Sequence, residues 1–119
     1  MGVVAWITGI VAALGFGMAG LAKVTWQKQM EEAAEHLSFS KQNFQAIGAA
    51  ELAGAVGVIL GTAVDDLEWI GIAAAIGLTA VGVGAVMNHR RVGDPPQAMV
   101  PPAVLTVVAL ISVISLTLR

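Results

Sequence analysis

The chain has 119 residues, which is enough for one domain spanning residues 1–119. Apolar residues make up 57% of it and charged residues only 12%, about half the charged share of a soluble domain. The net charge of −2 argues against nucleic acid as a partner, and the absence of cysteine excludes disulfides, thiol chemistry and zinc thiolate sites. A soluble bundle needs a polar face on every helix, which this composition cannot supply, so the chain is predicted to lie in a lipid bilayer.

Four long apolar stretches follow one another, at residues 3–22, 46–64, 69–87 and 99–118. Each is close to the roughly 20 residues that a helix needs to cross about 30 Å of hydrocarbon. Helices are favoured over strands because a membrane segment must satisfy its backbone hydrogen bonds internally. The first stretch lacks a preceding basic region and is too long for a signal peptide, so it is expected to remain as a membrane helix. The predicted fold is an all-α integral membrane four-helix bundle.

The polar connection at residues 23–45 is predicted to contain a short amphipathic helix between spans 1 and 2. Met30, Ala33, Ala34 and Leu37 recur at helical spacing, and acidic residues occupy the other face. Such a helix lies on the membrane surface or caps the bundle, with Trp26 as an interfacial anchor. A short solvated helix remains an alternative.

Short connections at residues 65–68 and 88–98 make consecutive spans antiparallel neighbours. The basic residues gather in the first and third connections, as Lys23, Lys28, Lys41, Arg90 and Arg91. The positive-inside rule therefore predicts a multi-pass protein of the cell membrane with loops 1 and 3 in the cytoplasm and both termini outside.

Small residues at four-residue spacing predict where helices pack against each other. The predicted packing residues are Gly9, Gly17, Gly57, Gly61 and Gly84. Small side chains let helix backbones approach closely in lipid, where no hydrophobic effect drives helices together. These glycines fit helix packing within one protomer, and equally helix packing between the two protomers of a homodimer.

A polar cluster is predicted where three helix ends meet. Glu51 is the only charged residue within the four apolar stretches, and a carboxylate there is costly unless it is paired, hydrated or protonated. Because consecutive spans run in opposite directions, Lys23, Glu51, Asn88 and His89 are expected at one level of the bundle. In one interpretation a Lys23–Glu51 ion pair fixes the register of the helices. In the other, the cluster lines a pocket that binds a polar head group or handles protons. His36, in the short helix, is expected to be solvated.

No catalytic residue or metal site is predicted. The sequence has no phosphate-binding loop, dinucleotide fingerprint, zinc-protease motif or serine nucleophile elbow. Two histidines and one glutamate on separate segments make a weak metal site. The sequence therefore does not decide whether the protein is an enzyme, and the lack of these motifs argues against enzymatic activity.

Four motifs together resemble the DoxX-like family of small four-helix membrane proteins. They are residues 20–23 (GLAK), 35–40 (EHLSFS), 47–61 (IGAAELAGAVGVILG) and 84–94 (GAVMNHRRVGD). The resemblance covers nearly the whole chain. It implies Lys23, Glu51 and His89 as candidate site residues.

The resemblance also implies several kinds of function. Family members include subunits associated with membrane oxidoreductases, one of them a thiosulfate:quinone oxidoreductase, partners of thiol-stress proteins, and a receptor assembly chaperone. The first hypothesis is therefore an accessory or non-catalytic subunit that binds a quinone-like or lipid head group, or a partner membrane protein such as an oxidoreductase. A small proton-coupled transporter is the second, and a purely structural or assembly protein the third. Lacking cysteine, the chain cannot use a thiol-based mechanism.

Overall fold

The computed structural model describes residues 2–119, which form helices and no strand. The helices in chain order are α1 (Gly2–Val24), α2 (Lys28–His36), α3 (Lys41–Ala63), a short 3-10 helix η1 (Asp65–Leu67), α4 (Glu68–Arg91) and α5 (Pro96–Leu118). Helices α1, α3 and α5 are each long and apolar enough to cross a membrane, and so is α4 when taken together with η1. The predicted all-α bundle of four membrane helices with a short helix between spans 1 and 2 is confirmed.

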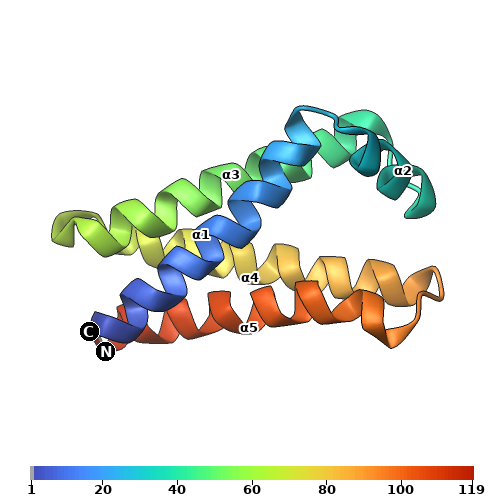
Figure 1. The fold of residues 1–119 in the computed structure, drawn as a ribbon. Coiled ribbons are helices and arrows are strands. Elements are labelled where there is room, and N and C mark those ends of the chain that lie inside the picture. Colours follow the sequence, from blue (N-terminus) through green and yellow to red (C-terminus); the bar gives the residue numbers. More distant parts are fainter. Residues whose placement is uncertain (1) are drawn as a thin grey trace.

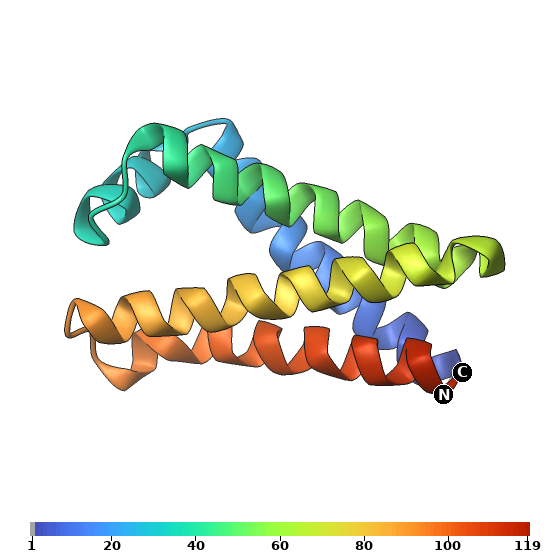
Figure 2. The same ribbon diagram turned by 180° about the vertical axis from the view of Figure 1, so that it is seen from behind.

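The four long helices form a closed ring of contacts, α1 with α3, α3 with α4, α4 with α5, and α5 with α1 (Figure 1). Helix α1 is tilted across the others, so that it starts beside the end of α5 and finishes beside the start of α3. Seen from behind, α3 and α4 meet at their connecting turn and diverge toward the opposite end, where α2 lies (Figure 2). We refer to that end, which carries α2, as the α2 end.

Glycines bring the helices into their closest contacts. Gly61 lies against the backbone of Gly71 and joins α3 to α4, and Gly20 lies against Gly48 and joins α1 to α3. A Cβ atom on Gly20 would stand 2.6 Å from the carbonyl oxygen of Gly48, closer than real side chains allow. The two backbones therefore touch, which only residues without a side chain permit.

The five glycines predicted to pack have different surroundings. Gly9 and Gly17 lie against side chains of α3, and Gly57 and Gly61 lie against α4. Gly84 has no atom within 4 Å of the place where a Cβ would stand, and it lines a cavity.

An apolar layer is tightly packed in the middle of the bundle, between the α2 end and the opposite end. The fully or almost fully buried residues of this apolar layer are Ala12, Phe16, Val58, Ala75, Leu78 and Ala109. At the end opposite α2, the Arg119 guanidinium donates hydrogen bonds to Glu68 at 3.1 Å and to the Thr62 carbonyl at 3.0 Å. These bonds tie the last residue of the chain to α4 and α3.

Helix α2 folds back onto the start of α3. Its apolar face buries Ala34, and the following Leu37 is also buried, both packing with Phe44 of α3. The Trp26 ring meets the Phe44 ring edge-on, with centroids 6.5 Å apart. The acidic residues of α2 are exposed. Helix α2 is therefore amphipathic and caps one end of the bundle.

Left-handed backbone bounds α2 on both sides, at Trp26 (φ 53°) and Ser38 (φ 63°). This conformation costs a residue with a side chain roughly 1–2 kcal/mol, and glycine almost nothing. The amide of Phe39 bonds back to the Ala34 carbonyl at 2.8 Å, which closes the helix end in the manner of a Schellman turn.

We expect Ser38→Gly to stabilise the protein. The relief of left-handed strain outweighs the added flexibility of the unfolded chain and leaves a gain of about 0.5–1 kcal/mol. Thermal unfolding in detergent micelles measures it. Ser40→Ala is the matched control: the Ser40 hydroxyl accepts a hydrogen bond from the Asn43 amide at 3.1 Å, so its loss should cost about 1 kcal/mol. A Ser38→Gly variant that melts at or below the wild-type temperature contradicts the strain argument.

Candidate functional site

A cavity of about 330 Å³ lies at the α2 end, bounded by α1, α2, α3 and α4. All four residues of the predicted polar cluster line it, so the structure brings them together around one space. The complete lining is Lys23, Met30, Ala33, Leu37, Phe39, Phe44, Ile47, Glu51, Val81, Gly84, Ala85, Asn88 and His89. The cavity thus combines four polar side chains with walls that are otherwise apolar.

Lys23 and Glu51 form an ion pair on the cavity wall, with Lys23 Nζ 2.8 Å from Glu51 Oε1. The two side chains are only 14% and 6% exposed. The contact between Gly20 and Gly48 stands one turn away on each helix and holds α1 and α3 close enough for the pair. Lys23 Nζ also lies 5.2 Å from the centre of the Phe44 ring, a cation–π distance.

Glu51 lies near the middle of α3, because this helix begins at Lys41 and not at the predicted start of the span, residue 46. The helix starts early because the Ser40 hydroxyl caps it and the polar residues that follow continue it. The apolar stretch that begins at residue 46 predicts Glu51 closer to the beginning of the helix.

Asn88 and His89 stand in the last turns of α4 and differ in their partners. The Asn88 side chain lines the cavity and forms no hydrogen bond with any other part of residues 2–119. His89 Nδ1 lies 2.6 Å from Asp94 Oδ2. Gly93 (φ 77°) makes this contact possible, because its left-handed backbone turns the chain back toward α4. The Asp94 amide then donates a hydrogen bond to the His89 carbonyl at 3.0 Å.

Asp94 also holds His36, whose Nε2 lies 2.6 Å from Asp94 Oδ1. The His36 side chain is 55% exposed, as expected for a solvated residue, but it has a partner that the sequence pattern does not predict. A second bond joins the same segments, from Arg91 to the carbonyl of Leu37 at 3.0 Å. The signal that could have revealed Asp94 was its position directly after a glycine at a helix end that carries a histidine.

The hydrogen bonds from His89 and, to a lesser degree, from His36 hold the pKa of Asp94 below its ordinary value of 3.8. Asp94 stands in the turn between α4 and α5, outside the membrane helices. Its carboxyl group is therefore ionised at neutral pH, and it can only accept hydrogen bonds.

We expect the Asp94 contacts to make the protein sensitive to acid. A carboxylate with a lowered folded-state pKa adds stability that is complete above its ordinary pKa and is lost as the pH falls through the lower folded value. Between about pH 5 and about pH 2, wild-type protein should therefore lose more thermal stability than Asp94→Asn. Melting curves of both proteins in micelles measure the difference. Equal losses for the two proteins would show that Asp94 contributes nothing to the acid response.

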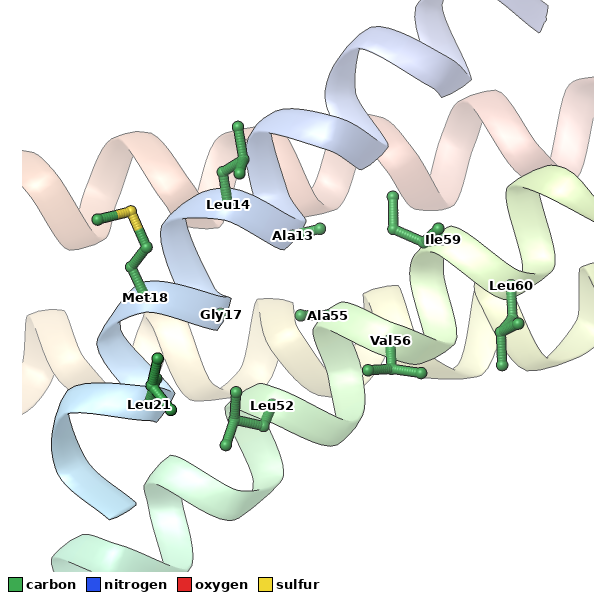
Figure 3. Close-up of a pocket in the computed structure, with 10 residues that line it drawn as sticks. All are labelled: Ala13, Leu14, Gly17, Met18, Leu21, Leu52, Ala55, Val56, Ile59 and Leu60. Atoms are coloured by element: carbon green, nitrogen blue, oxygen red, sulfur yellow. The ribbon is translucent and has the colours of Figure 1, made fainter. Parts of the chain in front are cut away.

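A second, open groove of about 470 Å³ runs between α1 and α3 on the outside of the bundle. Ala13, Gly17 and Ala55 lie between the two helices, and larger apolar side chains stand around them (Figure 3). No charged or hydrogen-bonding side chain lines this groove. It can hold hydrocarbon but offers no group for chemistry. No cluster of metal-ligating side chains occurs within residues 2–119 either.

Comparison with known proteins agrees with the motifs around this site. A model of the DoxX-like family matches residues 7–112. The chain belongs to the DoxX-like family. No curated protein and no solved structure matches the chain. The matched region of this DoxX-like protein includes Lys23, Glu51, Asn88, His89 and Asp94, so the whole lining of the cavity lies within the family region.

Membership in the family and the four apolar helices together make the molecule a multi-pass membrane protein. The surroundings of a DoxX-like bundle are therefore lipid, and its cavity is a mostly apolar pocket with four polar side chains at one end of a membrane-spanning structure.

Proposed function

We propose that this DoxX-like protein is an accessory, non-catalytic membrane subunit whose cavity at the α2 end binds the polar head of an amphipathic molecule. The observation that carries the proposal is one cavity of about 330 Å³ that gathers Lys23, Glu51, Asn88 and His89 among apolar walls. This volume lies within the roughly 300–1,000 Å³ typical of small-molecule sites, which pair apolar walls with a few polar groups.

The charges of the cavity favour a neutral head group. Lys23 and Glu51 neutralise each other, and His89 is bound to Asp94 outside the cavity wall. A charged ligand would have to compete with the buried ion pair, at a high cost in desolvation. Asn88 can both donate and accept hydrogen bonds. A carbonyl or hydroxyl group, as in a quinone-like molecule or the glycerol part of a lipid, matches these groups.

The apolar walls would take the remainder of such a molecule. Leu37, Phe39 and Phe44 stand on the side of α2 and α3, and Val81 and Ala85 on the side of α4. These side chains suit a ring or the first carbons of an acyl chain. The resemblance to oxidoreductase-associated relatives makes a quinone the first ligand to test, and an oxidoreductase the first partner.

The packing of the bundle disfavours a proton-coupled transporter. A transport path needs polar groups or water along the membrane, whereas the apolar layer around Phe16, Val58 and Leu78 closes the bundle beyond the cavity. Proton flux in proteoliposomes that depends on Glu51 would favour the transporter over the proposed binding role.

The distribution of charge supports a cytoplasmic α2 end. Lys23, Lys28, Lys41, Arg90 and Arg91 belong to the helix ends and connections at this end, and the opposite turn is acidic. By the positive-inside rule, the cavity would open on the cytoplasmic side with both termini outside. Because the chain lacks cysteine, single cysteines placed in each turn and labelled in intact cells test this orientation.

The binding proposal is tested with purified protein in micelles and a quinone that carries a short tail. Wild-type protein should melt at a higher temperature with the quinone, and Asn88→Leu should lose most of this shift. Met87→Leu is the matched control, since Met87 is the preceding residue on α4 but is 64% exposed on the outside. Monoacylglycerol and an anionic phospholipid serve as the lipid head groups for comparison. If none of these raises the melting temperature, the binding role fails.

Glu51→Gln separates a binding role from a purely structural one. A variant that folds normally but loses the ligand shift supports a site, whereas a variant that fails to fold supports a structural ion pair. Copurification from native membranes tests the accessory role. A protein that is always isolated alone would contradict it.

A further inference from the structure

Three segments of the chain meet at a single carboxylate. Asp94, in the turn between α4 and α5, holds His36 at the end of α2 with one oxygen and His89 in the last turn of α4 with the other, both at 2.6 Å. The Asp94 side chain is only 12% exposed, so little water competes for it. The binding role proposed above treats Asp94 only as the partner of His89 and gives no part to His36.

The contact with Asp94 determines which nitrogen of His89 carries hydrogen. An ionised carboxylate accepts hydrogen bonds and cannot donate them, so His89 Nδ1 must be the N–H donor. A neutral imidazole has one N–H, and therefore Nε2 of neutral His89 carries a free lone pair. Nε2 has no hydrogen-bond partner within residues 2–119, and His89 lines the cavity.

The same carboxylate fastens α2. Met30 and Ala33 of α2, with Leu37 just beyond it, form one wall of the cavity, so displacement of this helix would open the cavity. The left-handed residues Trp26 and Ser38 stand at the two ends of this segment. Apolar packing holds α2 to α3.

Polar bonds join the end of α2 to α4 and the turn that follows it. They are the His36–Asp94 contact and the bond from Arg91 to the Leu37 carbonyl at 3.0 Å. Val92 adds an apolar contact at the same place. The attachment of α2 to this side of the cavity is therefore short and mainly polar.

We propose that Asp94 is a positioning residue with two effects on one cavity: it holds α2 closed through His36, and it orients His89 so that Nε2 faces the cavity as a hydrogen-bond acceptor. A ligand group that donates, such as a hydroxyl, would be the natural partner of this nitrogen. The hydrogen bond between a ligand and His89 rests on the proposed binding function. The closure of α2 and the tautomer of His89 do not depend on that function.

The closure of α2 can be measured without any ligand. The chain has no cysteine, so Ala85→Cys places one thiol on the cavity wall, and its rate of reaction with a water-soluble maleimide reports opening. Adding Asp94→Ala or His36→Ala should raise this rate about tenfold, as expected for the loss of a charged hydrogen bond. Gln29→Cys, on the exposed face of α2, is the control whose rate should not change. An unchanged rate for the thiol on the cavity wall in both backgrounds overturns the closing role.

The orientation of His89 is measured by nitrogen NMR of the imidazole rings, which is simple because the chain has two histidines. Wild-type protein at about pH 8 should show His89 with hydrogen on Nδ1, and Asp94→Ala should shift it toward the Nε2–H form. Asp94→Glu should restore part of the wild-type signal. His36→Ala should leave the His89 signal as in wild type, because the bond from His89 to Asp94 remains. A His89 signal that Asp94→Ala does not change overturns the positioning role.

These outcomes are separable from those of the binding proposal. If no quinone or lipid binds but the thiol rate and the NMR signal respond to Asp94, the binding function fails and the inference about Asp94 stands. If a ligand binds and neither readout responds to Asp94, the inference fails alone.

Discussion

Lys23→Met should lower the free energy of unfolding by about 3–5 kcal/mol, the range observed when one partner of a buried ion pair is removed. The cause is Glu51, which is 6% exposed and forms its only ion pair within residues 2–119 with Lys23. Without Lys23, this carboxylate is left buried without a counter-charge. Unfolding in mixed micelles with increasing denaturing detergent measures the loss.

The double variant Lys23→Met with Glu51→Gln is the control for this prediction. With both charges removed no isolated ion remains, so the double variant should recover most of the stability that Lys23→Met loses. If Lys23→Met is as stable as wild type, the carboxylate is already hydrated or protonated. The ion pair would then contribute little to the fold.

A methyl group on Gly48 should have the next largest effect. In Gly48→Ala, the new Cβ would lie 2.6 Å from Lys23 Cβ and 2.8 Å from the Gly20 carbonyl oxygen. The backbone oxygen cannot move aside as a flexible side chain would, so α1 and α3 must separate. We expect a loss of about 1–3 kcal/mol, the usual cost of overpacking, and a weaker Lys23–Glu51 contact.

Gly77→Ala is the matched control for Gly48→Ala, since Gly77 is also a glycine inside a long helix but has no atom within 4 Å of a new Cβ. Alanine is the better helix former by about 1 kcal/mol, so this variant should be as stable as wild type or more so. Thermal unfolding of both variants in the same micelles decides the point. Two losses of equal size would show that glycine flexibility, and not the contact of α1 with α3, is responsible.

The two predictions concern one structural arrangement. The contact of Gly20 with Gly48 keeps α1 against α3, and the ion pair of Lys23 with Glu51 stands beside it on the wall of the cavity. A variant that separates these helices should therefore change both the stability and the shape of the proposed binding site. Ligand shifts measured on Gly48→Ala should be smaller than on Gly77→Ala.

Composition and the spacing of apolar residues are enough to predict that the chain lies in lipid and in which order its helices follow one another. Long apolar stretches with a single charge can only be membrane helices, because neither loops nor open strands satisfy their backbone in lipid. Short connections then made neighbouring helices antiparallel. The alternating direction of the helices is enough to predict that Lys23, Glu51, Asn88 and His89 lie at the same end of the bundle.

The rotation and tilt of each helix, in contrast, are seen only in the packed bundle. A membrane helix is apolar on every side, so its residue pattern does not show which face meets a neighbour. For this reason the close contact of Gly20 with Gly48, the open surroundings of Gly84 and the contact of His36 with Asp94 could not be read from spacing. Each depends on the distance between segments remote in the chain, which is set by the packing of the whole bundle.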